Sequence, residues 1–307
     1  MSTESPTPED LQRMLEQTKQ QSGQPNSENY NPLSKYMRQP QIYIKLPSEG
    51  EFWKDGSLDY PVNGELPVLS MSTRDELIFK SPDALMNGQG VIDVIEHCFP
   101  NVNDAWETPV TDIDILLIAI RIASYGEQME YHSTCPSCEA MNEYEIDLKS
   151  FLDKKVDMTG YLNELEYKDL KIKIKPQNYR SLNATNLDAF EQQRLMHLVN
   201  DSEISEEQKL KKFNDIFRKM TILTVRNISG IIDYILMPNG DKITNKGFID
   251  DFVENSDRQI FDALRKHQDH INEGMPDKSV NTTCPECQHT YTVPFTFDQS
   301  NFFVSAS

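Results

Sequence analysis

Two short cysteine motifs most constrain how this chain of 307 residues can fold: Cys135-Pro136-Ser137-Cys138 and Cys284-Pro285-Glu286-Cys287. A C-x-x-C turn supplies two thiolates from one tight loop, and two such turns complete a tetrahedral Zn²⁺ site. We predict that Cys135, Cys138, Cys284 and Cys287 hold one zinc ion. Since 145 residues lie between the motifs, against about 15 to 20 in an ordinary zinc ribbon, a whole subdomain must be inserted between the two halves.

The sequence around each motif supports their pairing. Ser133-Thr134 precedes the first motif much as Thr282-Thr283 precedes the second. Alternating apolar residues then follow each motif, namely Tyr144, Ile146 and Leu148 after the first and Tyr291, Val293 and Phe295 after the second. Alternation of this kind is typical of β-strands. We therefore expect each motif to be the turn of a β-hairpin, the two together making a split zinc ribbon.

Two disulfides or four free thiols are the alternatives to a metal site. Disulfides are disfavoured because the chain opens with the polar run Met1 to Ser5 and not with a secretion signal, which favours a reducing compartment. Four cysteines leave no open position for a catalytic water, so the zinc is expected to be structural. We expect His289 to be exposed on the hairpin turn and Cys98 to be a small buried residue.

Charge and hydropathy exclude several classes of protein. Thirty basic and 49 acidic residues give a net charge of −19, which disfavours nucleic-acid binding. The apolar run from 115 to 120 is far shorter than the roughly 20 residues that span a bilayer, so it predicts a core helix and no membrane span. The basic segment 168–175 predicts a strand whose exposed lysines discourage edge pairing, and the basic segment 209–219 predicts a solvated helix face.

The chain divides into three predicted parts with an α+β fold. Residues 1–40 are polar and are predicted to be a disordered arm that orders on a partner through Tyr30, Leu33, Tyr36 and Met37. Residues 41–150 and 281–307 are predicted to form a small mixed core with the split zinc ribbon. Residues 151–280 are predicted to form a mainly helical inserted subdomain that carries a hairpin.

Local patterns predict the individual elements. Strands are expected at 41–47, 66–71, 170–174 and 231–237, with hairpin turns at 62–65 and 238–241. Helices are expected at 91–98, 111–125, 181–199 and 205–226, with a last helix ending at 270. Capping patterns occur at Thr73 to Glu76, Ser81-Pro82, Ser205 to Gln208 and Ser256 to Gln259.

No catalytic motif is present in the sequence. It contains no glycine-rich phosphate loop, no G-x-S-x-G and no H-E-x-x-H. His267 and His270 are three residues apart on a predicted helix and are expected to be an exposed pair, not metal ligands. We therefore predict that the protein is not an enzyme.

Three segments carry a resemblance to a known family. They are Ile42 to Ser48, Asp75 to Gly88, and Leu117 to Gly126 followed by the first cysteine motif. In these segments the chain resembles the baseplate hub and hub-assembly proteins of T4-like contractile-tailed bacteriophages, over residues 40–148 and at the second motif. The resemblance implies a late structural or assembly protein without catalysis. It implies contacts with other baseplate hub and tail proteins, and a location in the virion tail baseplate and, during assembly, the host cytoplasm. It is compatible with a homo-oligomer.

Three functions are consistent with these observations. A structural component of the baseplate hub, acting by protein–protein contacts, is favoured and stays in the finished tail. A hub assembly chaperone acts during morphogenesis and is absent from the mature virion. A zinc-ribbon nucleic-acid-binding protein has phosphate affinity that falls steeply with salt.

Overall fold

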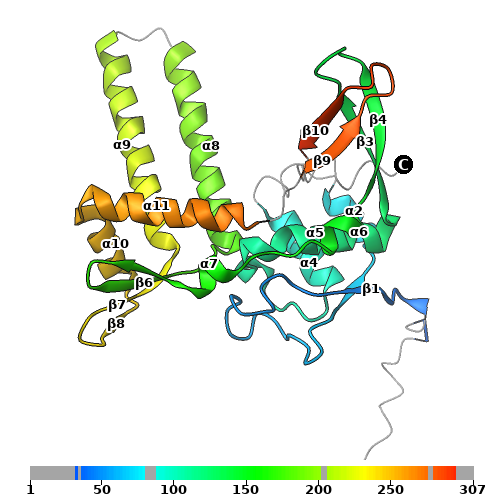
Figure 1. Ribbon diagram of the computed structural model, residues 1–307, viewed down its shortest axis with the longest axis horizontal. Coiled ribbons are helices and arrows are strands. Elements are labelled where there is room, and N and C mark those ends of the chain that lie inside the picture. Colours follow the sequence, from blue (N-terminus) through cyan, green and yellow to red (C-terminus); the bar gives the residue numbers. More distant parts are fainter. Residues whose placement is uncertain (1–31, 34–35, 80–87, 202–205, 276–278, 295–307) are drawn as a thin grey trace, which may run out of the picture. The chain divides into compact units, whose positions relative to one another are not determined.

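The computed structural model describes residues 32–33, 36–79, 88–201, 206–275 and 279–294 (Figure 1). The chain divides into two compact units, residues 1–38 and residues 39–307. In the first unit Leu33, Tyr36 and Met37 are exposed, and Tyr30 lies outside the described residues. In the second unit Ser81-Pro82, Ser205 and Phe295 also lie outside the described residues. Within the described ranges, no helix has both the length and the hydropathy needed to cross a bilayer.

A first hydrophobic core in the second unit is built around one helix that is apolar on almost every side. This is α5 (Val110–Tyr125), which buries ten of its 16 residues, as expected for a helix without a polar face. A two-stranded antiparallel sheet, β1 (Pro40–Ile44) with β2 (Leu66–Leu69), contacts it. The helices α2 (Thr73–Phe79) and α4 (Gln89–Cys98) and the 3₁₀ turn η2 (Ala105–Glu107) complete this core. The predicted strand at 41–47 and the helices at 91–98 and 111–125 are confirmed within a few residues.

A buried carboxylate fixes the loop after β1 to helix α5. Asp112 accepts hydrogen bonds from the Ser48 backbone N–H at 3.0 Å, the Ser48 hydroxyl at 2.5 Å and the Trp53 indole N–H at 2.9 Å. Burial raises the pKa of Asp112 above its usual range, and the hydrogen bonds from Ser48 and Trp53 oppose that rise. Because a buried carboxylate without donors is costly, Asp112 holds the loop in one position.

Several predicted turns and caps in this core need correction. The turn at 62–65 forms, with Gly64 at a φ of 72°, but β2 pairs with the distant β1, so the predicted local hairpin is wrong. Helix α2 is capped by Ser72, whose hydroxyl and backbone N–H both bond Asp75, one residue before the predicted pair. Helix α5 begins after Pro109, not at Thr111, and ends at Gly126 as predicted.

A second hydrophobic core is covered by a four-stranded antiparallel sheet in the order β5-β6-β7-β8. The strands are β5 (Glu164–Tyr167), β6 (Leu170–Ile174), β7 (Ile232–Leu236) and β8 (Lys242–Ile243). The predicted hairpin at 238–241 is confirmed as the connection between β7 and β8, with Gly240 at a φ of 89°. β6 pairs on both sides, so the prediction that its lysines protect a sheet edge is wrong.

Helices supply the rest of the inserted region. They are α7 (Thr159–Leu162), α8 (Tyr179–Asp201), α9 (Glu206–Gly230), α10 (Lys246–Asn255) and α11 (Arg258–Glu273). Figure 1 shows α8 and α9 as a long antiparallel pair. The predicted helices 181–199 and 205–226 are confirmed, and α10 has no counterpart among the predictions. Helix α11 is capped by Asp257, which accepts from the Gln259 backbone N–H at 3.1 Å, and not by Ser256. On α9 Leu210 is 62% exposed, as expected of the predicted solvated face at 209–219, whereas Ile216 is buried.

The two cores meet along a short backbone contact. The Val110 N–H donates to the Gln177 carbonyl at 2.9 Å, and the Tyr179 N–H donates to the Thr108 carbonyl at 2.8 Å. The rings of Phe52 and Tyr161 add an apolar contact, with their centroids 5.6 Å apart. The segment after β6 therefore lies beside the start of α5.

Candidate metal centre

The first cysteine motif is the turn of a regular β-hairpin. β3 (Gln128–Thr134) pairs antiparallel with β4 (Met141–Asp147). At the turn the Cys135 N–H donates to the Ala140 carbonyl and the Glu139 N–H donates to the Cys135 carbonyl, both at 2.9 Å. Glu139 has a φ of 58°, in the left-handed region. These bonds close a tight loop with both cysteines at its tip.

The second motif repeats this turn. β9 (Ser279–Thr283) pairs antiparallel with β10 (Thr290–Pro294). The Cys284 N–H donates to the His289 carbonyl and the Gln288 N–H donates to the Cys284 carbonyl, again at 2.9 Å, and Gln288 has a φ of 61°. The predicted β-hairpin at each motif is confirmed for the described residues.

The two turns bring all four predicted cysteines together. Their sulfur atoms lie within 4.8 Å of one another. Cys135 Sγ is 3.7 Å from Cys287 Sγ, and Cys138 Sγ is 3.7 Å from Cys284 Sγ. A tetrahedral ion with metal–sulfur bonds of about 2.3 Å requires sulfur–sulfur separations of about 3.8 Å. The cluster therefore has the size of a four-thiolate metal site. The separations are far beyond the roughly 2.05 Å of a disulfide, and no cysteine is in one.

Hydrogen bonds around the sulfurs shift the pKa of Cys284 and that of Cys138 in opposite directions. Backbone N–H groups of Cys287 and Glu286, together with the Asn142 side chain, lower the pKa of Cys284 to about 6. Asn142 is buried and its amide donates to Cys284 Sγ at 3.4 Å. A backbone hydrogen bond from Ala140 lowers the pKa of Cys138, but hydrogen bonds with the other thiols outweigh it and raise that pKa to about 12. The four sulfur atoms have the separations of a tetrahedral shell, so the cluster could hold a divalent metal ion.

Asn142 is a site residue that the sequence reasoning missed. Counted from the first cysteine of each motif, Asn142 occupies the position of Tyr291 in the second hairpin, so no repeated pattern marks it. The predicted equivalence of Tyr144 with Tyr291 is therefore wrong by two positions. The two tyrosines nevertheless meet, with their hydroxyl oxygens 3.1 Å apart and their rings in an edge contact.

The histidines lie outside this cluster. His289 is exposed, as predicted, and stacks on the Tyr291 ring. His267 lies against the Gly160 carbonyl at 2.9 Å and is half-buried, so its predicted exposure is wrong, whereas His270 is exposed beside Glu273. Cys98 is fully buried in the first core, as predicted. Within the described ranges, the four cysteines are the one group of three or more His, Cys, Asp and Glu side chains that can hold a metal ion.

Comparison with protein families decides the broader identity. The family model for the T4 bacteriophage base plate protein matches residues 62–304, which include both hairpins and everything between them. The chain belongs to the T4 bacteriophage base plate protein family. Searches of curated proteins and of solved structures each gave no significant match. The family assigns this base plate protein a structural role in the phage tail, with other tail proteins as its partners. The resemblance noted in the sequence is confirmed at that level.

Proposed function

We propose that this base plate protein is a structural component of the baseplate hub, which acts through protein–protein contacts during tail assembly. The family match over residues 62–304 is the observation that carries the proposal. The segments that resemble hub proteins, Ile42 to Ser48, Asp75 to Gly88 and Leu117 to Gly126, support the finer assignment to the hub. The role is structural and not catalytic.

The four cysteines bind Zn²⁺ as a structural ion in this proposal. Thiolates select zinc among the common divalent ions of the cell, and four of them leave no position for water or substrate. Separations of 3.7 Å between sulfurs support a tetrahedral shell. The ion would hold β3–β4 against β9–β10, so that its binding energy stabilises the contact between two distant chain segments.

The proposal keeps the predicted three-part organisation. Residues 1–40 form an arm that orders on a tail partner, residues 41–150 and 281–307 form the core with the zinc ribbon, and residues 151–280 form the inserted subdomain. Two separate hydrophobic cores support the last two parts, since Ile44 to Phe151 supply nearly all of the first and Tyr161 to Ile271 supply the second.

Two measurements test the function. Elemental analysis of the purified chain should give about one zinc per chain, which Cys284→Ser should abolish. Mass spectrometry of purified virions should detect the protein at a fixed ratio to the other hub proteins. Its absence from finished virions, together with its presence in assembly intermediates, would overturn the structural role in favour of an assembly chaperone.

A further inference from the structure

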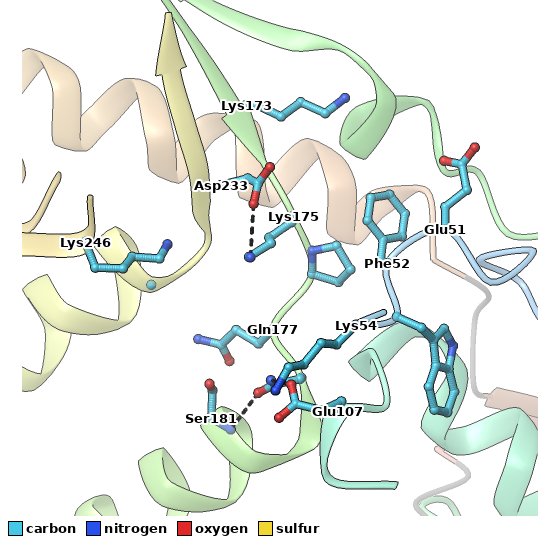
Figure 2. Close-up of a pocket in the computed structure, with 14 residues that line it drawn as sticks. Glu51, Phe52, Lys54, Glu107, Lys173, Lys175, Gln177, Ser181, Asp233 and Lys246 are labelled. Carbon is cyan, nitrogen blue, oxygen red and sulfur yellow. Dashed lines mark hydrogen bonds and ion pairs between the residues drawn. The ribbon is translucent and has the colours of Figure 1, made fainter. Parts of the chain in front are cut away.

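Two of the molecule's cavities differ in how their polar groups are paired. A pocket of about 570 Å³ lies where the two cores meet, and Lys175 and Asp233 on its lining form an ion pair at 3.0 Å (Figure 2). A groove of about 380 Å³ lies between helices α8 and α9. In the groove a buried polar group has no partner among the residues that the structure describes. The groove is therefore the cavity that points to a ligand.

The groove is mostly apolar and is formed by both helices of the α8–α9 hairpin. Its apolar lining residues are Ala189 and Met196 of α8, and Met220 and Leu223 of α9. Near the base of the hairpin, the Thr185 hydroxyl donates to Asn227 Oδ1 at 2.9 Å. The two helices thus leave an apolar furrow beyond the point where polar side chains join them.

Large apolar side chains extend the groove onto the outer surface of the hairpin. Phe190 on α8 and Phe217 on α9 are both exposed. Phe217 is three residues before Met220 and seven before Thr224, which line the groove, so these three residues share one side of α9. Phe190 is three residues before Gln193, which lines the groove from α8. The two phenylalanines therefore form the rim of one continuous apolar face.

A buried amide lies within this apolar face. Gln192 lines the groove and is 8% exposed, and its Oε1 accepts no hydrogen bond from any residue that the structure describes. A buried acceptor without a donor is costly. Rotation about the Cγ–Cδ bond exchanges the oxygen and the NH₂ group, so either one can face the groove. The groove needs an occupant that is apolar and carries one polar group at this level.

A second copy of the hairpin supplies that polar group. A primary amide is both a donor and an acceptor, so two Gln192 side chains beside a two-fold axis satisfy each other, the NH₂ of each donating to the oxygen of the other. A two-fold interface brings the same surface from both copies together. One buried polar layer of this kind also fixes the register of packed helices.

The size of the apolar face also suits a second copy. Helix α8 has 23 residues and α9 has 25, so at about 1.5 Å per residue each is roughly 35 Å long. Two helices whose axes lie about 10 Å apart present a face of roughly 700 Å², and each partner in a standard interface buries about 800 Å². One helix of another protein would fill the groove but leave the rim at Phe190 and Phe217 partly exposed.

We propose that the α8–α9 hairpins of two copies of this chain pack face to face into a four-helix bundle, with their Gln192 amides hydrogen-bonded across the two-fold axis. Antiparallel helix pairs bury their apolar faces in this way. Tyr179 at the start of α8 is buried in the first core, and Ile228 near the end of α9 packs against the second. The bundle therefore connects the cores of both copies. The inference goes beyond the proposed function and does not rest on it.

Sedimentation velocity on the full chain, over a range of micromolar concentrations, tests the proposal and should show a dimer. Met220→Glu should weaken self-association by about hundredfold or more, because it places a charge in each buried face. The matched control is Ile222→Glu. Ile222 is 47% exposed, against 43% for Met220, and lies two residues further along α9, outside the groove. Residues two apart do not share a helix face, so this control should leave the affinity within about twofold.

Far-UV circular dichroism checks that each variant keeps its helices. Phe190→Glu, at an exposed position on α8, provides the same test where Met220→Glu does not fold. A chain that stays monomeric would overturn the proposal and leave the groove to a helix of another protein. A dimer that persists in Met220→Glu and Phe190→Glu would overturn it as well, because the copies would then meet through a different surface.

Subunit exchange tests the pairing of the Gln192 amides. Gln192→Leu removes both partners of the hydrogen bond at once, so this variant should dimerise at least as well as the unchanged chain. A mixed dimer leaves one amide unpaired. Native mass spectrometry of Gln192→Leu with isotope-labelled unchanged chain should therefore show mixed dimers depleted about fivefold or more from the half expected by chance. A statistical mixture would overturn the pairing.

Zinc content separates a failure of this inference from a failure of the proposed function. The groove residues lie outside the cysteine cluster, so every variant should bind as much zinc as the unchanged chain. A monomer that retains zinc counts against the bundle alone and leaves the proposed function standing.

Discussion

The two cysteine hairpins have the same turn but different anchors. The first has seven residues in each strand, and Met129, Ile146 and Leu148 are buried in the first core. The second has five residues in each strand, with Val293 buried and Val280 partly buried. The same turn hydrogen bonds thus occur on one hairpin held by a core and on another that has little apolar anchorage among the residues that the structure describes.

The comparison shows where a bound ion matters. Burial of large apolar side chains fixes the first hairpin with or without a metal. The contacts of the second hairpin with the first include the four thiols, the Asn142–Cys284 bond, the Tyr144–Tyr291 contact and a hydrogen bond between Tyr144 and Thr282. We expect metal removal to release the second hairpin and leave the first in place.

The largest effect is expected when two cysteines are removed from the second hairpin. Cys284→Ser with Cys287→Ser should reduce bound zinc from about one per chain to none. Backbone amides of β9 and β10 should then exchange at nearly the rate of an unfolded chain, while those of β3 and β4 keep their protection. Hydrogen exchange read by mass spectrometry measures both hairpins in one experiment.

Cys98→Ala is the control for that experiment. Cys98 is fully buried in the first core and outside the thiol cluster, so this variant should retain the metal and the protection of both hairpins. Persistent protection of β9 and β10 in the double serine variant would mean that the second hairpin is held by its own packing, and the contrast between the hairpins would fail.

Acid should produce a similar but graded release. Cys284 has a pKa of about 6, below its ordinary value of 9.0, so its thiolate contributes stability that is complete above pH 9 and is lost as the pH falls through 6. Zinc affinity should fall by about tenfold per pH unit for each proton that the thiols take up. Titration with a competing chelator, at several pH values between about 8 and about 5, measures this zinc affinity. A flat affinity profile would contradict thiolate ligation.

A smaller effect, on the free energy of unfolding, should distinguish the buried apolar residues of the first hairpin from those of the second. Ile146→Ala should lower the free energy of unfolding by about 2–4 kcal/mol, with or without zinc, because it leaves a cavity in the first core. Val293→Ala removes less apolar surface and should cost about 1–2 kcal/mol, detectable only while zinc holds the second hairpin. Urea unfolding of each variant, with zinc and with chelator, gives the four values. If zinc changed the loss of unfolding free energy equally in Ile146→Ala and Val293→Ala, the two hairpins would not be anchored differently.

The smallest expected effect is at the tyrosine contact. Tyr144→Phe removes one partner of the hydroxyl pair with Tyr291 but keeps the ring contact. Exchange of the β10 amides should accelerate by about tenfold or less, with zinc content unchanged, because one solvated hydrogen bond contributes little. His289→Ala, which alters a stacking contact on the same ring, is the comparison. Loss of zinc in Tyr144→Phe would show that the hairpins need more than their thiols.

The cysteine cluster was predictable because its constraint is local and chemical. Each C-x-x-C pair fixes two ligands in one turn, and four thiols in one chain have few uses. Asn142 was not predictable, because a single amide approaches Cys284 only after the two hairpins have met. Helix α5 was predictable from its continuous apolar run and from Gly126 at its end.

The pairing of strands that are far apart in the sequence was the main feature of the fold that the sequence did not predict. β2 follows a sound turn signal at Asn63-Gly64 yet pairs with β1, since the strand partner depends on which apolar faces the core must cover. The alternation of Lys171, Lys173 and Lys175 correctly predicted a strand. It gave no indication that two of these lysines line a pocket with Lys54 and Lys246, because the other elements reach that point only through the tertiary fold.

The 145 residues between the two cysteine motifs also set an order of events during synthesis. A ribosome adds about 5 to 20 residues per second, so Cys284 follows Cys138 after about 7 to 30 seconds. Throughout that interval the first hairpin would supply only two of the four cysteines, and a metal ion bound to it would stay exchangeable. Because Cys284 and Cys287 are made after the inserted subdomain, the four cysteines can come together only once that subdomain has been synthesised. A tail partner that recognises the two hairpins together would select completed subunits and reject nascent ones.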